Sequence, residues 1–208
     1  GEMRSQPVSL AGVETVDCSL PSQPANGWCA SKGIPTTGRK VFTSNGHNNG
    51  TTATSGTSGL EFPANATTAQ LTSLERLAPL WQYPVSGADN AAYIAGTRTL
   101  ELNQSGELRN RNHLLGDIVG SSPAYVRDTG TIYVGANDGM LHAIDATNGN
   151  EQFAFIPGIV NWNELGTLSR QDYGHRYFVD GPIVVTSQQQ TPGANILVGA
   201  LGKGGKGL

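Results

Sequence analysis

A glycine-rich run near the C-terminus has the spacing of a nucleotide-binding loop. Gly202-Lys-Gly-Gly-Lys-Gly207 satisfies the pattern Gly-x-Gly-x-x-Gly and follows a predicted strand. A dinucleotide site also needs a following helix and a downstream acidic residue, and the sequence has neither. The P-loop pattern fails as well, because no Ser or Thr follows the last Lys. We therefore interpret the run as a glycine-rich hairpin turn.

Metal ligation has equally weak support in the sequence. Asp145-Ala-Thr-Asn-Gly-Asn150 offers oxygen ligands, but its Gly is at the fifth position rather than the sixth and the distant bidentate Glu of a calcium loop is absent. An Asx-type turn between strands explains this segment better. His47, His113 and His175 show no ligand spacing with one another or with the cysteines, so no metal site is predicted.

No catalytic set can be assembled from the remaining polar residues. Ser121-Ser122 lacks the context of a nucleophile elbow. Four aspartates fall at strand ends or turns, where carboxylates accept backbone hydrogen bonds: Asp117, Asp138, Asp145 and Asp180. His142 lies within a strand and is predicted to be a partly buried structural residue that bonds a neighbouring blade. We expect a protein that is not an enzyme, with no cofactor bound in this segment.

Two cysteines, Cys18 and Cys29, are the one pair suited to covalent chemistry. They lie eleven residues apart in a stretch rich in Pro and Gly. A disulfide there would restrict the unfolded chain, and it would indicate an oxidising compartment. The alternative is two free thiols in a cytosolic protein. Low charge and a structureless setting favour the bridge.

Composition narrows the class of protein. The chain has 208 residues, a net charge of −3, 14% charged residues and 28 glycines. Such a balance is typical of turn-rich β proteins with polar, uncharged surfaces, and it does not favour nucleic acid as a partner. No apolar run is long enough to span a bilayer, and the N-terminus has no hydrophobic signal core.

The elements that would position these residues are clearest between 131 and 155. Apolar residues alternate in three short stretches, and Asn137-Asp138-Gly139 and Asp145 to Asn150 supply the turns between them. A meander of this length predicts one blade of a β-propeller. Asn195-Ile-Leu-Val-Gly-Ala-Leu201 repeats Thr131-Ile-Tyr-Val-Gly-Ala-Asn137, which predicts the start of a second blade.

The predicted fold class is all-β: about two blades of a propeller, residues 91–208, preceded by a loop-rich segment, residues 1–90, with one or two short helices. Propellers need four to eight blades, so we expect the chain to be a piece of a larger protein. Strands are also predicted at 117–126 and 177–185, each with a Pro, and helices at 69–80 and 91–96. The polar stretch 44–59 is either a variable contact element or a disordered insertion without a role.

Four motifs together resemble the C-terminal β-propeller of the PilC/PilY family of type IV pilus proteins. They occur in this order: Leu115-Gly-Asp-Ile-Val-Gly-Ser-Ser-Pro123, Tyr133-Val-Gly-Ala-Asn-Asp-Gly-Met-Leu-His-Ala-Ile-Asp-Ala-Thr147, His175-Arg-Tyr-Phe-Val-Asp-Gly181 and Leu197-Val-Gly-Ala-Leu-Gly-Lys-Gly-Gly-Lys-Gly207. Tyr93-Ile-Ala-Gly-Thr-Arg98 with Leu108-Arg-Asn-Arg111 resembles the segment that leads into that propeller. Before residue 90 the resemblance is limited to Arg39-Lys-Val-Phe-Thr43.

The resemblance implies a fold of the quinoprotein type and export to the periplasm, the outer-membrane surface and the pilus tip. It implies roles in pilus assembly, adhesion and twitching motility through contacts with minor pilins, and with a host or abiotic surface. The family's calcium loop would lie in a later blade, so calcium is expected elsewhere in the full-length protein. Two alternatives stay open: a fragment of a pyrroloquinoline-quinone dehydrogenase, and a scaffold propeller of outer-membrane assembly.

Overall fold

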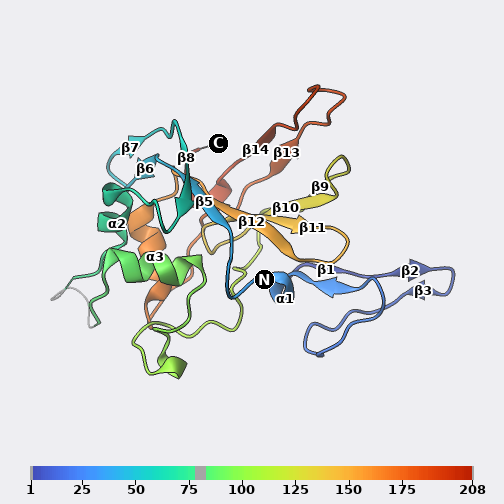
Figure 1. Cartoon of the computed structure of the whole chain (residues 1–208), viewed down its shortest axis with the longest axis horizontal. Coiled ribbons are helices and arrows are strands. Elements are labelled where there is room, and N and C mark those ends of the chain that lie inside the picture. The colour runs from blue at the N-terminus through green and yellow to red at the C-terminus, as the bar shows by residue number, and fades with distance from the viewer. Residues whose placement is uncertain (1, 78–82, 208) are drawn as a thin grey trace.

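A six-stranded sheet organises the computed structural model, which describes residues 2–77 and 83–207 (Figure 1). The predicted strand at 117–126 and the predicted three-stranded meander together form four of its strands, antiparallel and in chain order: β9 (Ala124–Val126) from the former, and β10 (Thr131–Gly135), β11 (Leu141–Asp145) and β12 (Glu151–Ile156) from the meander. β5 (Val41–Ser44) pairs in parallel with β12, and β8 (Gly59–Phe62) pairs antiparallel with β5. The blade-like meander is therefore extended at its outer edge by strands from the N-terminal segment.

Glycine sets both turns of the meander, as predicted. Gly139 has a φ of 93° and Gly149 a φ of 76°, values that L-residues with side chains adopt at a cost. The alternating apolar residues then reach both faces of the sheet, and Val134, Met140 and Ile144 are fully buried. Local pattern and turn chemistry agree here, so the prediction of this meander is confirmed.

The predicted all-β class needs correction, because the fold is mixed α/β. The second blade is represented by one hairpin only, β13 (Ile183–Val185) with β14 (Leu197–Gly199). Among the described residues the strands do not close into a propeller. The predicted strands at 117–126 and 177–185 shrink to their last three residues, because Pro123 and Pro182 have no N–H for a ladder.

Helices cover one side of the sheet, on the left in Figure 1. α2 (Thr68–Leu74) begins at a capping box in which Thr67 and Gln70 bond each other's backbone N–H groups. It ends before the predicted limit, and Pro79, Leu80 and Trp81 of that prediction lie outside the described residues. α3 (Gly87–Ala95) begins earlier than predicted, at the Ser86 cap, and ends as predicted at Gly96, whose φ is 125°.

Short elements complete the chain. They are α1 (Ala30–Gly33), α4 (Trp162–Leu165) and the 3-10 turns η1 (Leu102–Gln104), η2 (Gly166–Ser169) and η3 (Gly202–Gly204). At the N-terminus, β1 (Arg4–Ser5) pairs with β4 (Trp28–Cys29), and β2 (Val8–Ser9) with β3 (Gly12–Val13). The β2–β3 hairpin extends away from the rest of the molecule (Figure 1). None of the helices in the described ranges is long and apolar enough to cross a membrane.

The polar stretch 44–59 is ordered in the structure. It forms a hairpin of β6 (His47–Asn48) and β7 (Ala53–Thr54) that lies against the region around α4. The Asn48 side chain donates to the carbonyl of Ile159 at 2.8 Å, and the Asn163 side chain donates to the carbonyl of Asn49 at 2.8 Å. Of the two alternatives for this stretch, a disordered insertion does not describe it.

The predicted division of the chain into a loop-rich segment, residues 1–90, and a propeller region, residues 91–208, remains a proposal. The sheet itself crosses residue 90, since β5 and β8 pair with the meander. Two apolar cores result. The larger one includes Phe62, Leu74 and Trp162 and joins the helices to the sheet; the smaller one surrounds Trp28 on the N-terminal segment.

Candidate functional site

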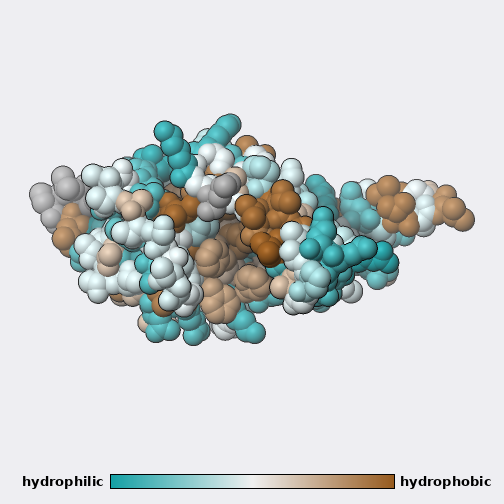
Figure 2. Space-filling model, turned by 90° about the horizontal axis from the view of Figure 1, so that it is seen from above, coloured by the Kyte–Doolittle hydropathy of each residue, from teal (hydrophilic) through white to brown (hydrophobic). Residues whose placement is uncertain are grey.

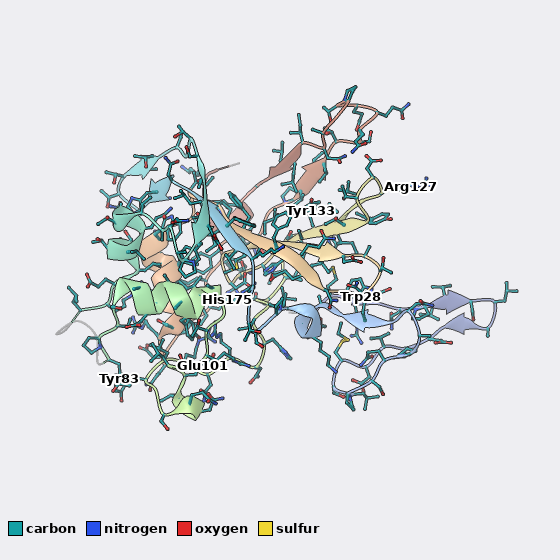
Figure 3. The ribbon with its side chains drawn as sticks, in the orientation of Figure 1. Trp28, Tyr83, Glu101, Arg127, Tyr133 and His175 are labelled. Atoms are coloured by element: carbon teal, nitrogen blue, oxygen red, sulfur yellow. A yellow bond between two sulfur atoms is a disulfide. The ribbon has the colours of Figure 1, made fainter. Side chains whose placement is uncertain are left out.

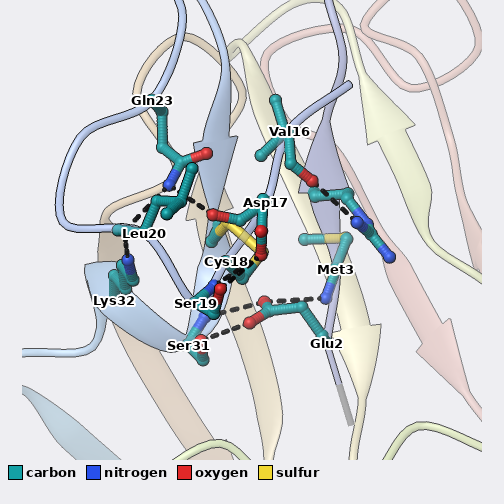
Figure 4. Close-up of a disulfide and its surroundings, with 12 residues drawn as sticks. Glu2, Met3, Val16, Asp17, Cys18, Ser19, Leu20, Gln23, Ser31 and Lys32 are labelled. Atoms are coloured by element: carbon teal, nitrogen blue, oxygen red, sulfur yellow. Dashed lines mark hydrogen bonds between the residues drawn. A yellow bond between two sulfur atoms is a disulfide. The ribbon is translucent and has the colours of Figure 1, made fainter.

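The two cysteines form a disulfide in the N-terminal segment (Figure 4). The Cα atoms of Cys18 and Cys29 are 5.8 Å apart, and the bond joins β4 to the loop that precedes it. Glu2 lies beside them and accepts a hydrogen bond from the backbone N–H of Ser31 at 3.0 Å. These three residues are the only group with metal-ligand spacing in the described part of the chain, and disulfide sulfurs are not thiolate ligands. We therefore interpret the Cys18–Cys29 bond as a structural cross-link and not as part of a metal site.

A buried network of four ionic side chains connects the N-terminal segment to the meander. Arg39 donates to both carboxylate oxygens of Glu151, at 2.7 and 2.8 Å. Glu151 also bonds His142 Nδ1 at 2.7 Å, and His142 Nε2 lies 3.1 Å from Asp138 Oδ2. His142 was predicted to be partly buried and to bond a neighbouring blade. It is fully buried, and its two partners belong to its own blade.

The protonation states of these four side chains follow from their contacts. Burial opposes a charged His142, but Asp138 and Glu151 outweigh burial and raise the pKa of His142 to about 9. Burial would raise the pKa of Glu151, yet the bonds from Arg39 and His142 lower it to about 2. At neutral pH Arg39 and His142 are therefore cations, and Glu151 and Asp138 are anions. The charges of this network balance, and its role is to stabilise the fold rather than to transfer a proton.

A second ion cluster holds the segment before the meander. Fully buried Glu101 accepts from Arg111 Nε at 2.8 Å and from Arg98 Nε at 3.2 Å (Glu101 is labelled in Figure 3). The Arg111 guanidinium also lies 3.7 Å from the centre of the Tyr93 ring. Arg98 and Arg111 belong to the segment that resembles the lead into the propeller. Both bind the Glu101 carboxylate, and they thereby hold the loop between them in place.

A third polar cluster joins the first blade to the segment that leads into the second. His175 Nε2 lies 2.7 Å from Asp117 Oδ2, and Asn137 donates to the same oxygen at 3.0 Å. Asn137 in turn accepts from the backbone N–H of Phe178 at 3.0 Å. Burial acts to raise the pKa of Asp117, but the bonds from Asn137 and His175 leave it lowered.

The other predicted polar residues have structural partners. Asp138, Asp145 and Asp180 each accept a backbone N–H, as predicted, whereas Asp117 bonds side chains. Ser121 Oγ accepts from the backbone of Gly135 at 2.9 Å, and His47 bonds Ser73 at 2.9 Å. The glycine-rich run 202–207 forms the 3-10 turn η3 rather than a hairpin turn. Nothing in the described ranges brings a nucleophile, a base and an acid together.

One cavity of about 300 Å³ lies between these clusters. α3, the segment around Arg109 and the first turn of the meander form its walls. Arg109, His113 and Asp117 contribute charged or polar groups to it, and Tyr93 and Tyr173 contribute aromatic surface. The sequence placed no site here, because Arg109 and Asp117 come from segments without a shared motif. His113 was considered only as a metal ligand.

The meander with its flanking motifs defines a blade-like antiparallel sheet, and comparison with known proteins shows which family such a sheet belongs to here. Residues 115–208 match the family described as the PilY1 beta-propeller domain. The chain is 38% identical over 174 residues to a type IV pilus biogenesis factor PilY1 homolog of Xylella fastidiosa, and 38% identical over 153 residues to the type IV pilus biogenesis factor PilY1 of Pseudomonas aeruginosa strain PAK. No solved structure matches the chain significantly.

The chain therefore belongs to the PilY1 family, which confirms the resemblance inferred from the motifs. The two alignments cover 70% and 59% of this chain. They cover only 14% and 13% of the relatives, so the chain spans about a seventh of their length. Their names describe pilus biogenesis factors.

Proposed function

We propose that this chain is part of a type IV pilus biogenesis factor that acts through protein contacts rather than catalysis. The observation that carries the proposal is the 38% identity over 174 residues to a relative named for that role. The described residues contribute structural ion clusters and a sheet, which suit a scaffold. The dehydrogenase and outer-membrane-assembly alternatives have no comparable support in the relatives.

The proposed location is outside the cytoplasm: the periplasm, the outer-membrane surface and the pilus tip. The Cys18–Cys29 disulfide supports this location, because such bonds persist in oxidising compartments. Minor pilins are the proposed partners in assembly, and a host or abiotic surface is the proposed target in adhesion and twitching motility. We also propose that any calcium requirement resides elsewhere in the full-length protein, since Asp145–Asn150 is a plain turn here.

The β2–β3 hairpin is the best-suited contact element of the described residues. Val8, Leu10 and Val13 on it are 78%, 110% and 60% exposed. Figure 2 shows apolar side chains gathered at the far end of this projecting arm. Exposed apolar residues on a projecting element are typical of interaction surfaces, because water contact is unfavourable for them.

Deleting the gene in its own bacterium tests the function. We expect fewer surface pili, smaller twitching zones and weaker attachment than in the parent. A plasmid copy should restore all three. Normal piliation, twitching and attachment in the deletion strain would refute the proposal.

A further inference from the structure

We propose that the cavity between α3 and the first turn of the meander binds a small carboxylated sugar. The site uses Arg109 and His113 for the carboxylate and Asp117 for a hydroxyl group. Its volume of about 300 Å³ is at the lower end of ligand pockets, which suits a ligand about the size of a single sugar ring. This binding goes beyond the proposed role in pilus assembly and does not depend on it.

Arg109 differs from Arg111, two residues further on, in how many of its donors are used. Arg111 places its three guanidinium nitrogens on Glu101 and on the carbonyls of Tyr93 and Thr97. Arg109 uses only Nε, which donates to the carbonyl of Leu168 at 2.8 Å. Within the described ranges its two terminal nitrogens have no hydrogen bond and no carboxylate partner. They form a planar pair of donors that matches a carboxylate.

Arg109 is also held in position. Its backbone N–H donates to the carbonyl of Ser169 at 2.9 Å, and its carbonyl accepts from the Tyr93 hydroxyl at 3.0 Å. The guanidinium lies 4.8 Å from the centre of the Tyr173 ring. A donor fixed in this way loses little conformational freedom when a ligand binds, so more of the contact energy appears as affinity.

The remaining walls complete the specificity. His113 is exposed and has no hydrogen-bond partner among the described residues, so its ring N–H is available to an anion. Asp117 uses Oδ2 for Asn137 and His175, which leaves Oδ1 to accept a ligand hydroxyl. Tyr173 is partly exposed and offers aromatic surface to the carbon face of a ring, beside the buried side chains of Tyr93 and Leu168. A carboxylate at one end and hydroxyl groups at the other fit this arrangement of charges.

Isothermal titration of the full chain with D-galacturonate tests the site. D-galactose has the same ring without the carboxylate, and acetate has the carboxylate without the ring. We expect galacturonate to bind about tenfold or more tightly than either one, as loss of a charge-assisted hydrogen bond implies. Equal affinities, or no detectable galacturonate binding, would overturn the proposal.

Two variants and a control locate the binding. Arg109→Gln should weaken galacturonate about tenfold, and His113→Ala should weaken it severalfold without touching the core. The matched control is Arg127→Gln, since Arg127 is an exposed arginine in the β9–β10 turn (labelled in Figure 3) and does not line the cavity. Thermal unfolding establishes that each variant folds. Unchanged affinity in folded Arg109→Gln, or in His113→Ala if the first variant fails to fold, would contradict the assignment.

Discussion

At the scale of single residues, protonated His142 bridges two carboxylates inside the sheet. Removing one of them tests how strongly this network of four ionic side chains stabilises the fold. We expect Glu151→Gln to lower the free energy of unfolding by about 3–5 kcal/mol, because Arg39 and His142 would then be buried without their shared anion. Urea unfolding measures the change. Glu107→Gln is the control: this glutamate is exposed, and its loss should cost within about 0.5 kcal/mol.

The same residue predicts how stability depends on pH. The pKa of His142 is raised from 6.5 to about 9, so its contribution is complete below pH 6.5 and is lost as the pH rises through 9. The pKa of Glu151 is lowered from 4.5 to about 2, so its contribution is present above pH 4.5 and is lost as the pH falls through 2. Urea unfolding from pH 2 to 10 should show both losses. In His142→Gln the alkaline loss should be smaller; an unchanged alkaline limb would show that His142 does not cause it.

Sequence alone could predict His142 as structural but not its partners. Its neighbours in the sequence gave no sign that Glu151 would lie beside it across the β11–β12 pair. Arg39 is separated from Glu151 by 112 residues, and no periodic pattern encodes such a contact. The cavity was missed because no sequence pattern indicates that residues 109–117 pack with α3 and Tyr173 to form its walls.

At the scale of elements, the turn at Gly149 couples the meander to the N-terminal segment. A Cβ on Gly149 would lie 2.6 Å from the Trp28 ring, and its φ of 76° is unfavourable for other residues. Gly130→Ala is a matched comparison, since its φ is 62° but nothing lies within 4 Å of a Cβ there. We expect about 1–2 kcal/mol of destabilisation for Gly130→Ala from conformation alone, and more for Gly149→Ala. Equal losses in thermal unfolding would mean that Trp28 yields freely.

The disulfide belongs to the same scale, because it closes the loop before β4. Replacing Cys18 and Cys29 with Ser should lower the free energy of unfolding by about 2–3 kcal/mol for a loop of this length. Hydrogen exchange should rise mainly in β1 and β4 and leave the meander protected. Uniformly faster exchange throughout the sheet would contradict this local role.

Elements divide clearly into those that local pattern predicts and those that it does not. The meander was predictable because apolar alternation and two glycine turns lie within about 25 residues of continuous sequence. The addition of β5 and β8 to its outer edge was not, because parallel pairing over more than a hundred residues has no local signature. The second blade was overpredicted from the short repeat at 195–201, whose strand β14 pairs only with the three residues of β13 that follow Pro182.

At the scale of the whole molecule, the β2–β3 hairpin projects away from the two apolar cores, so its role in contacts can be tested without changing the stability of the fold. Replacing Val8, Leu10 and Val13 with Thr removes exposed apolar surface and should leave the thermal unfolding temperature nearly unchanged. If the hairpin contacts other pilus proteins, a strain with this variant should have reduced piliation. The control is Leu102→Gln, an apolar residue 46% exposed on η1, which should leave piliation normal. Normal piliation with the hairpin variant would assign the contacts to another surface.

Association with pili tests most directly whether this protein acts as part of the pilus system. Pili sheared from the parent strain and from a strain lacking the major pilin are compared by immunoblotting for this protein. A pilus-associated factor should be present in the sheared fraction of the parent and strongly depleted from that of the pilin mutant, at equal total amounts in the cells. Equal amounts in both sheared fractions would contradict the claim.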